Sequence, residues 1–248
     1  FLLPALQLLV WTFTTAQESI SWSFLSLTWN SLMLAAVAAI VAVLLALLLA
    51  YGKRLRSTPL IQGSVRTAAM GYAVPGTVIA VGVLIPFAWL DNTIDGWMRE
   101  TFGISTGLLL SGTLVALIFA YTVRFLSVSI QAVESGLAKI KPSMDDAGRS
   151  LGLRPMGVLR KIHLPIMKGT VLTALLLVFV DVLKELPATL ILRPFNFNTL
   201  AVRAYEMAAD ERLADAGAPA LMIVLAGIIP VILLSRAISR ARAGGETP

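Results

Sequence analysis

The sequence predicts an all-α integral membrane protein with about six transmembrane helices. Apolar residues make up 57% of its 248 residues and charged residues only 14%, whereas about a quarter of the residues in soluble proteins are charged. The mean hydropathy is +0.84. The net charge of +6 comes from basic residues in short intervals between apolar runs, which is the pattern of membrane topology and argues against a nucleic-acid partner.

Apolar runs place the spans, because about 20 residues are needed to cross the hydrocarbon core. The run 1–13 is shorter, and we expect it to be the outer end of a truncated first helix, followed by an exposed polar loop at 14–27. Since the chain starts inside this run and without Met, we expect a fragment of a longer polypeptide rather than a signal peptide. The remaining spans are predicted at 28–51, 67–90, 106–130, 170–192 and 218–235, the second of these kinked by its glycines and proline.

The distribution of basic residues predicts the orientation of these helices. With the polar intervals assigned alternately to two sides, one side carries fourteen Lys and Arg and the other four. The basic side is predicted to be cytoplasmic, and it includes the interval 139–169 and the tail 240–248. We assign 28–239 to one transmembrane domain. The basic residues on the cytoplasmic side are Lys53, Arg54, Arg56, Arg66, Lys139, Lys141, Arg149, Arg154, Arg160, Lys161, Lys168, Arg236, Arg240 and Arg242.

The interval 139–169 is the longest polar stretch of the sequence and predicts a helix-turn-helix elbow. Ser143 suits the N-cap of a short helix. Gly152 suits the left-handed conformation that ends such a helix, and Pro155 suits the first turn of a second helix that runs to about residue 165.

The first helix of this elbow combines carboxylates with small residues. Asp145 and Asp146 fall in its first turn, where negative charge meets the positive end of the helix. Ala147, Gly148 and Gly152 present little bulk, so that another protein could approach the backbone closely. This pattern favours a protein-docking surface. The alternative is a basic loop held near anionic lipid.

The spacing within the elbow resembles a motif of binding-protein-dependent ABC importer permeases, E-A-A-x3-G-x9-I-x-L-P. Asp146 stands where that family usually has Glu, and Gly148 where it usually has the second Ala. The resemblance implies a type I importer fold in which this coupling loop docks on a cytoplasmic ABC ATPase dimer. It implies a docking helix around the first motif positions and Gly152, with the last three positions packed against the membrane core. The matching residues are Asp146, Ala147, Gly148, Gly152, Ile162, Leu164 and Pro165.

The sequence contains no motif for nucleotide hydrolysis or for metal binding. It has no G-x-x-x-x-G-K-[ST] loop, no Gly-rich dinucleotide fingerprint, no H-E-x-x-H spacing and no cysteine. We therefore expect a transport subunit and not an enzyme, without catalytic residues, cofactor or tightly bound metal, and with ATP and magnesium on a partner subunit. The one histidine, His163, lies at a variable position of the motif and is expected to be a solvated loop residue.

Charged residues interrupt the fifth predicted span. Asp181 lies roughly 18 Å along the helix from Gly169 and so near the bilayer midplane, where charge is costly. Asp181, Lys184 and Glu185 are three and four residues apart, so we expect them to share a face on which Lys184 neutralises one carboxylate. Pro187 is expected to kink the helix beside them. This face either lines the translocation path or its gate, or it is a polar lock that contacts no substrate.

This segment resembles, more specifically, the ferric-iron permeases of the same family. It reads K-E-L-P-A-T-L from Lys184, then L-R-P and N-T-L-A, and the earlier run Y-A-V-P-G-T at 72–77 is also similar. The resemblance implies ferric iron delivered by a periplasmic binding protein, and a chain that is the C-terminal half of a permease with two fused halves. The carboxylates of Asp181 and Glu185 suit a hard ion, and Lys184 argues against a tight metal cage.

Several alternatives remain open in the sequence. Thiamine, polyamine and sulfate permeases share the loop motif, and the second transmembrane half could be a fused half or a second copy. An ion-driven secondary transporter or a membrane scaffold would also be hydrophobic, although inverted repeats are not evident. The charges in the external interval 195–217 suit a docked binding protein about as well as a solvated surface. The predicted location is the bacterial inner membrane, with the coupling loop and the C-terminus cytoplasmic.

Overall fold

The computed structural model describes residues 2–19 and 22–243, and every regular element in this part of the chain is helical. The helices α2, α4 and α5 are long and apolar enough to cross a membrane, and shorter apolar helices lie at Leu2–Thr15 and Gly217–Ile232. The predicted spans correspond in order to α1, α2, α4, α5, α9 and α12, which confirms the all-α membrane fold. The elements are α1 (Leu2–Ser19), α2 (Trp22–Leu55), α3 (Pro59–Ala68), η1 (Gly71–Ala73), α4 (Gly76–Phe102), α5 (Leu114–Ala138), α6 (Pro142–Ser150), α7 (Pro155–Val158), η2 (Leu159–His163), α8 (Leu164–Ile166), α9 (Lys168–Leu183), α10 (Pro187–Leu192), α11 (Leu200–Ala209) and α12 (Gly217–Ala243).

The core forms where α2 packs against α5 and α9. Small side chains recur every three or four residues along the buried face of α2, so the neighbouring backbones can approach closely. The opposite face exposes large apolar side chains such as Leu44 and Leu48, as expected for a surface that faces lipid. The buried small residues are Ala35, Ala38, Ala42, Ala46 and Ala50.

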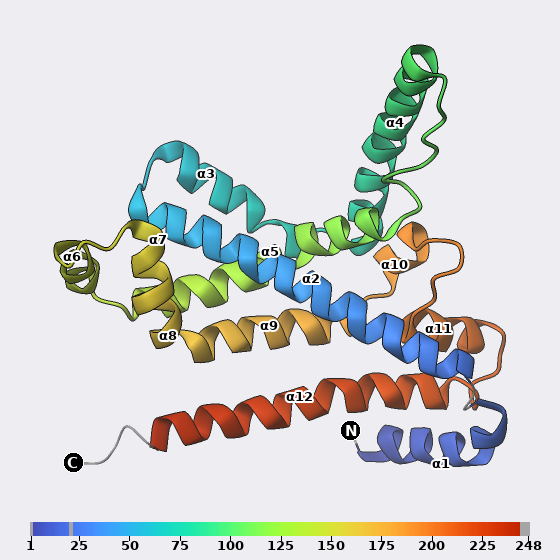
Figure 1. Cartoon of the computed structure of the whole chain (residues 1–248). Helices are drawn as coiled ribbons and strands as arrows, with labels where there is room; N and C mark the ends of the chain where they lie inside the picture. Colours follow the sequence, from blue (N-terminus) through green and yellow to red (C-terminus); the bar gives the residue numbers. More distant parts are fainter. Residues whose placement is uncertain (1, 20–21, 244–248) are drawn as a thin grey trace.

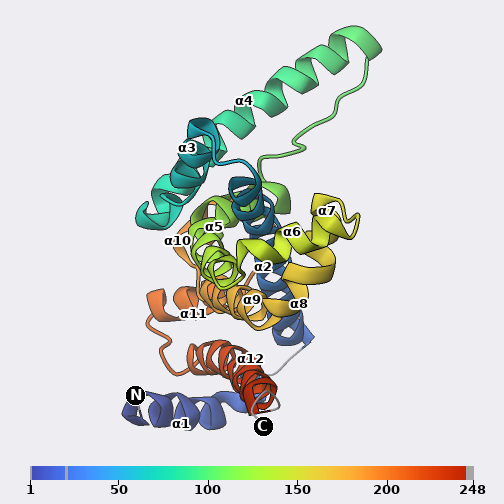
Figure 2. The ribbon, with the colours of Figure 1, turned by 90° about the vertical axis from the view of Figure 1, so that its left-hand side faces the viewer.

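The other helices are arranged around this three-helix core. Figure 1 shows α12 along one side of the core with α1 outside it, and the elbow α6–α8 at one end of the bundle. The helix α4 projects away from the core, and the perpendicular view shows the same projection (Figure 2). The elbow and the far end of α4 therefore lie at opposite ends of the molecule.

The polar loop predicted at 14–27 is wrong, because α1 continues to Ser19 and α2 begins at Trp22. Hydroxyl groups in and beside this region donate to carbonyl groups three or four residues earlier, as in the bonds from Thr14 to Trp11 and from Thr28 to Phe24. Polar side chains satisfied in this way are compatible with a helix. The predicted tail 240–248 is helical to Ala243, and its residues 244–248 lie outside the described residues.

The boundaries of the next two spans also differ from the prediction. The segment 67–90 is not one kinked helix, because α3 ends at Ala68 and α4 begins only at Gly76. Most of the interval between the predicted spans 67–90 and 106–130 belongs to α4, which continues to Phe102 and ends at Gly103 in the left-handed conformation (φ 68°). The fourth span begins only at Leu114. A connecting strap, residues 103–113, therefore joins α4 to α5.

Two carboxylates one helical turn apart hold the strap against α4. Asp95 accepts hydrogen bonds from the backbone N–H groups of Thr106 and Gly107. Asp91 is only 1% exposed and accepts from the backbone N–H groups of residues 109, 110 and 111 and from the hydroxyl of Ser111. These carboxylates thus supply hydrogen-bond acceptors to a segment that has no helical partners of its own.

We expect Asp91→Ala to destabilise the purified protein by about 3 kcal/mol, because it leaves several buried donors unsatisfied. Ser111→Ala removes only one of these bonds and should cost about 1 kcal/mol. Thermal unfolding in detergent measures both effects, and equal melting temperatures for the two variants would contradict the role assigned to Asp91.

Candidate functional site

The candidate site begins with the elbow, which has the predicted helix-turn-helix form. Its first helix, α6, ends before Gly152, whose φ of +80° is the left-handed conformation expected there. Pro155 occupies the first turn of α7, also as predicted. The N-cap differs: Lys141 holds that position, and Pro142 takes the first turn in place of the predicted Ser143.

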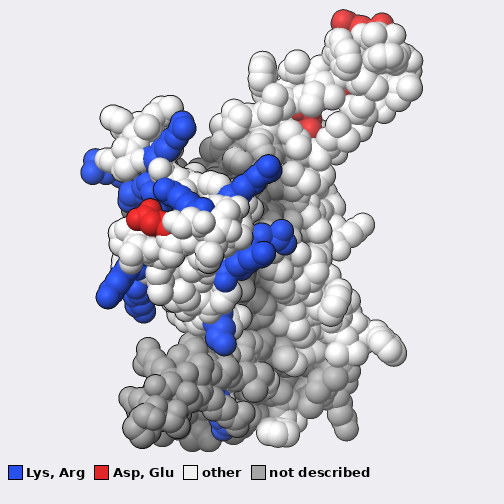
Figure 3. All heavy atoms as spheres, turned by 60° about the vertical axis from the view of Figure 1, so that its left-hand side comes forward, with Lys and Arg blue, Asp and Glu red and all other residues white. Residues whose placement is uncertain are grey.

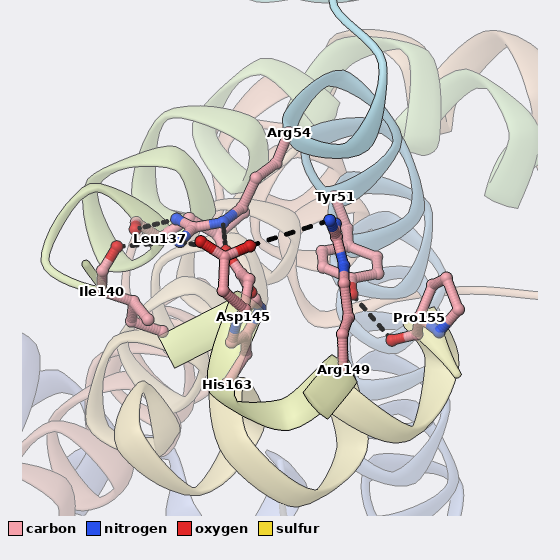
Figure 4. A network of polar contacts seen from close by, with 9 residues as sticks. Tyr51, Arg54, Leu137, Ile140, Asp145, Arg149, Pro155 and His163 are labelled. Atoms are coloured by element: carbon pink, nitrogen blue, oxygen red, sulfur yellow. Dashed lines mark hydrogen bonds and ion pairs between the residues drawn. The ribbon is translucent and has the colours of Figure 1, made fainter. Parts of the chain in front are cut away.

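Asp145 points inward and anchors α6 to the end of α2 (Figure 4). Arg54 donates to Oδ2 of Asp145 from Nε at 3.0 Å and from a terminal nitrogen at 2.7 Å. Burial alone would raise the pKa of Asp145, but the hydrogen bonds and charge of Arg54, together with His163, hold that pKa below its usual range. Asp145 is therefore an ionised anchor at neutral pH.

Arg54 and Tyr51 extend this anchor to both limbs of the elbow. Arg54 also donates to the backbone carbonyl groups of Leu137 at 2.7 Å, in the last turn of α5, and of Ile140 at 2.8 Å, just after that helix. The hydroxyl of Tyr51 donates to the carbonyl of Pro155 at the start of α7, at 2.7 Å. The last turns of α2 thus bind the segments before and after α6.

His163 is not the solvated loop residue that the sequence predicted. Its side chain is 0% exposed, and Nε2 lies 2.5 Å from Oδ1 of Asp145. The ring of Tyr51 packs edge-on against it, with 5.4 Å between the ring centroids. The helical turn η2 carries His163 to the inner side of the elbow, where it becomes part of the anchor.

The two faces of α6 have different surroundings. Gly148 is buried, and a Cβ there would lie 2.8 Å from Cδ1 of Ile162 and 3.1 Å from Cγ2 of Val158. On the outer face, Asp146 is 74% exposed and Ala147 is also exposed. The departure from the family pattern at Gly148 therefore falls where the two limbs of the elbow touch.

Apolar and basic side chains surround the exposed face of α6. Leu151 is 82% exposed, and Met144 and Met156 are exposed beside it. Figure 3 shows Lys and Arg gathered around the elbow, whereas the tip of α4 carries acidic residues. An apolar patch with a basic rim is suited to contact with another protein. The exposed basic residues of this region are Lys139, Lys141, Arg149, Arg154, Arg160, Lys161 and Lys168.

The second limb packs on the membrane core only in part as predicted. Ile162 is half-buried against Gly148, and Leu164 packs against the cluster formed by α2, α5 and α9. Pro165, which was expected to pack there as well, is exposed. The reason is that His163 and Met167 occupy the inward positions of this turn.

The charged residues of the fifth span do not share one face. Lys184 forms an ion pair with Asp181 at 2.9 Å and is itself 64% exposed. Glu185 is only 7% exposed and lies 3.3 Å from Nε of Arg124 on α5. The cause is that α9 ends at Leu183 and α10 starts at Pro187, so the predicted kink is a complete break that turns Glu185 away.

These residues form no metal cage. Within residues 2–19 and 22–243, no three His, Cys, Asp or Glu side chains converge as a metal site. Asp181 and Glu185 each have a cationic partner, Lys184 and Arg124. The arrangement is one of balanced ion pairs. It resembles the polar lock, one of the two alternatives that the sequence left open for these residues.

The sequence reasoning missed Arg54, Tyr51 and Arg124 as members of these sites. Arg124 had a signal, because an arginine inside an apolar span is costly and usually has a function or a partner. Arg54 had none beyond its position at the end of a helix, since its partner Asp145 is 91 residues away in sequence.

We expect Gly148→Leu to destabilise the elbow by about 1–3 kcal/mol, because the new side chain overlaps Ile162 and Val158. Gly148→Ala should be tolerated, since Cδ1 of Ile162 is the mobile end of its side chain. Ala147→Leu on the exposed face is the matched control and should leave stability unchanged. Thermal unfolding measures all three variants, and a stable Gly148→Leu protein would contradict the close packing.

A pH dependence follows from the lowered pKa of Asp145. Its contribution to stability is complete above the unfolded-state pKa of about 4, and it is lost as pH falls through the lower folded-state pKa. Hydrogen exchange of residues 142–150 should therefore show protection that decreases only under acidic conditions. Asp145→Asn should reduce protection at neutral pH by about 1 kcal/mol and remove this acid dependence; an unchanged pH profile in the variant would exclude Asp145 as the titrating group.

Several known proteins with related sequences are permeases. The chain is 29% identical over 236 residues to the Fe(3+)-transport system permease protein FbpB 2 of Haemophilus influenzae, covering 94% of this chain and 44% of that protein. PhnV of Salmonella typhimurium, named for a 2-aminoethylphosphonate transport system, is 25% identical over 168 residues, covering 68% and 57%. The spermidine/putrescine permease PotC of Escherichia coli is 22% identical over 263 residues, covering 99% and 91%. The chain thus spans about half the length of the first two.

The fold and the family agree with the elbow motif. A chain in the crystal structure of a bacterial alginate ABC transporter has the same fold, with a TM-score of 0.72, 13% identity, and coverage of 98% of this chain and 89% of that one. The family model for the inner membrane component of binding-protein-dependent transport systems matches residues 42–243. This chain therefore belongs to that family, the membrane permeases of ABC importers.

Proposed function

We propose that this chain forms half of the translocation pathway of an ATP-driven importer, and that its cargo is ferric iron delivered by a periplasmic binding protein. The observation that carries the proposal is the elbow. Its outer face is exposed, small and rimmed with basic residues, while Asp145 and Gly148 fix its inner face to the bundle. A partner ATPase dimer that binds ATP and magnesium would press on a rigid element and move α5 and α9.

The helix α4 supports the proposal of a second transmembrane half. Large apolar side chains are exposed along one side of it at helical spacing, and they include Val78, Val81, Ile85 and Trp89. Such a stripe on a projecting helix needs a partner or lipid to cover it. The iron relative is more than twice as long as this chain, of which the chain covers 44%, which suits a fused second half better than a second copy.

The orientation proposed for the molecule has the elbow in the cytoplasm of a bacterial inner membrane. The exposed Lys and Arg gather at that end (Figure 3), as the positive-inside rule requires. The opposite end, with α11 and the tip of α4, would then meet the binding protein.

Ferric iron is favoured by the run K-E-L-P-A-T-L and by the identity to FbpB 2, which exceeds that to the aminoethylphosphonate and polyamine permeases. Asp181 supplies a hard oxygen ligand, and its ion pair with Lys184 keeps the path from holding an ion tightly. Weak contact suits a conduit, because a site that binds strongly does not release.

The test uses the full-length parent protein in proteoliposomes with its ATPase. We expect ferric-loaded binding protein to stimulate ATP hydrolysis severalfold over the empty form, because only the loaded form should favour the closed state. Binding proteins loaded with 2-aminoethylphosphonate, a polyamine, thiamine or sulfate are the alternatives. Stimulation by one of these instead would replace iron as the cargo and leave the importer intact, and no association with any ATPase would overturn the role of the elbow.

Gly152→Glu should abolish this stimulation, with at least about a tenfold loss, while the protein still inserts in the membrane. The new side chain points into open space, and it places bulk and negative charge on the docking face. Gly152→Ala is the matched control, because it carries the same backbone cost of a side chain at φ 80° but adds neither bulk nor charge to the docking face. Equal stimulation in both variants would refute the docking assignment.

A further inference from the structure

Two helix breaks meet at one buried ion pair in the middle of the molecule. The first break lies between η1 and α4, at Val74 and Pro75. The second lies between α9 and α10, at residues 184–186. Each leaves backbone groups without helical partners, which must be satisfied inside the protein when the surroundings are apolar.

Arg124 on the continuous helix α5 contacts both breaks. One of its terminal nitrogens donates to the carbonyl of Val74 at 3.0 Å. Its Nε lies 3.3 Å from Oε2 of Glu185, and both side chains are largely buried. Arg124 therefore joins the two breaks through a single guanidinium group.

Glu185 is fixed on its other side by α10. Its Oε1 accepts from the backbone N–H of Ala188 at 3.3 Å, one of the free N–H groups at the start of that helix. Its backbone carbonyl accepts from the hydroxyl of Thr189, which pairs with the hydroxyl of Tyr121 on α5. The start of α10 is thus bound to α5 through two separate contacts.

The first residue of α4 closes against the same pair. A Cβ on Gly76 would lie 2.5 Å from Oε1 of Glu185 and 3.0 Å from a terminal nitrogen of Arg124. A side chain at this position would therefore have to displace the ion pair. The start of α4 and the ion pair are in direct contact.

The topology connects this ion pair to the elbow. The elbow lies between the end of α5 and the start of α9, and Arg124 and Glu185 bring the same two helices together again at a distance. At 1.5 Å per residue, α5 spans about 21 Å from Arg124 to its end, and α9 about 24 Å from its start to the break. The helices α5 and α9 are therefore connected at one end by the elbow and near the other end by the ion pair.

We propose that Arg124 and Glu185 form a positioning latch that transmits movement of the elbow to the two broken helices, α4 and α10. This inference rests on the proposed importer function, and it assigns the pair a role in coupling rather than in contact with cargo. When the ATPases shift the elbow, α5 and α9 change their relative position, and the latch carries that change to the helices that border the path. A purely structural ion pair would hold the same residues together but would not transmit movement of the elbow to α4 and α10.

The experiment measures movement at the breaks without requiring the cargo. Spin labels on Tyr72→Cys in η1 and Ile191→Cys in α10, both exposed positions, give the distance between the two breaks by pulsed electron resonance. These 248 residues contain no native cysteine that would take up label. The full-length permease with its ATPase is compared without nucleotide and with ATP trapped by vanadate.

We expect a nucleotide-dependent change in this distance, reduced at least about threefold by Glu185→Gln, because the neutral amide no longer holds Arg124. ATPase association and basal hydrolysis should persist, since the elbow is untouched. Glu134→Gln is the matched control, because Glu134 is also on α5. The substitution breaks the ion pair of Glu134 with Lys53 of α2 but touches neither helix break, so the nucleotide-dependent distance change should remain.

The double variant Arg124→Gln with Glu185→Gln separates a latch from a purely structural ion pair. It leaves no unpaired buried charge, so the fold is preserved even if the single variant is unstable. Continued loss of the distance change supports the latch, whereas its return overturns it. If the wild-type complex binds its ATPase but shows no distance change, the latch is overturned and the importer function stands. If the ATPase does not bind, the proposed importer function itself is overturned.

Discussion

The ion pair between Arg54 and Asp145 is the contact on which the functional end of this protein depends. A docking helix can transmit force only if its inner side is fixed, and one guanidinium group here binds the carboxylate of α6 and two carbonyl groups at the end of α5. His163 and Tyr51 complete the anchor from the second limb and from α2. The exposed face can therefore meet a partner without the elbow folding away.

Three interruptions of the helices have backbone groups that are hydrogen-bonded by charged side chains. Asp91 and Asp95 bind the strap after α4, and Arg124 with Glu185 binds the two central breaks. In an apolar environment such charges are costly unless they are paired and hydrogen-bonded. Their cost is offset by these ion pairs and hydrogen bonds, which let the chain change direction inside the bundle.

The core of the bundle and the projecting helix α4 differ in how their apolar surfaces are covered. The alanine face of α2 holds α5 and α9 at close range, whereas α4 is left projecting with an apolar side uncovered (Figure 1). A rigid core that carries the elbow and a projecting helix with an uncovered apolar side suit the half-permease proposed above. The charged residues of the fifth predicted span are neutralised by their partners, so they do not by themselves indicate a cargo.

The sequence by itself determined the class of fold, the approximate spans and the form of the elbow. These depend on local properties, namely the length of apolar runs, the left-handed preference of Gly152 and the first-turn preference of Pro155. Only the tertiary structure decided which charges meet. Asp145 and Glu185 find partners on other helices, and the i, i+4 rule that placed Glu185 beside Asp181 holds only in an unbroken helix. His163 was misjudged for the same reason, because its burial depends on where α2 ends and not on its neighbours in sequence.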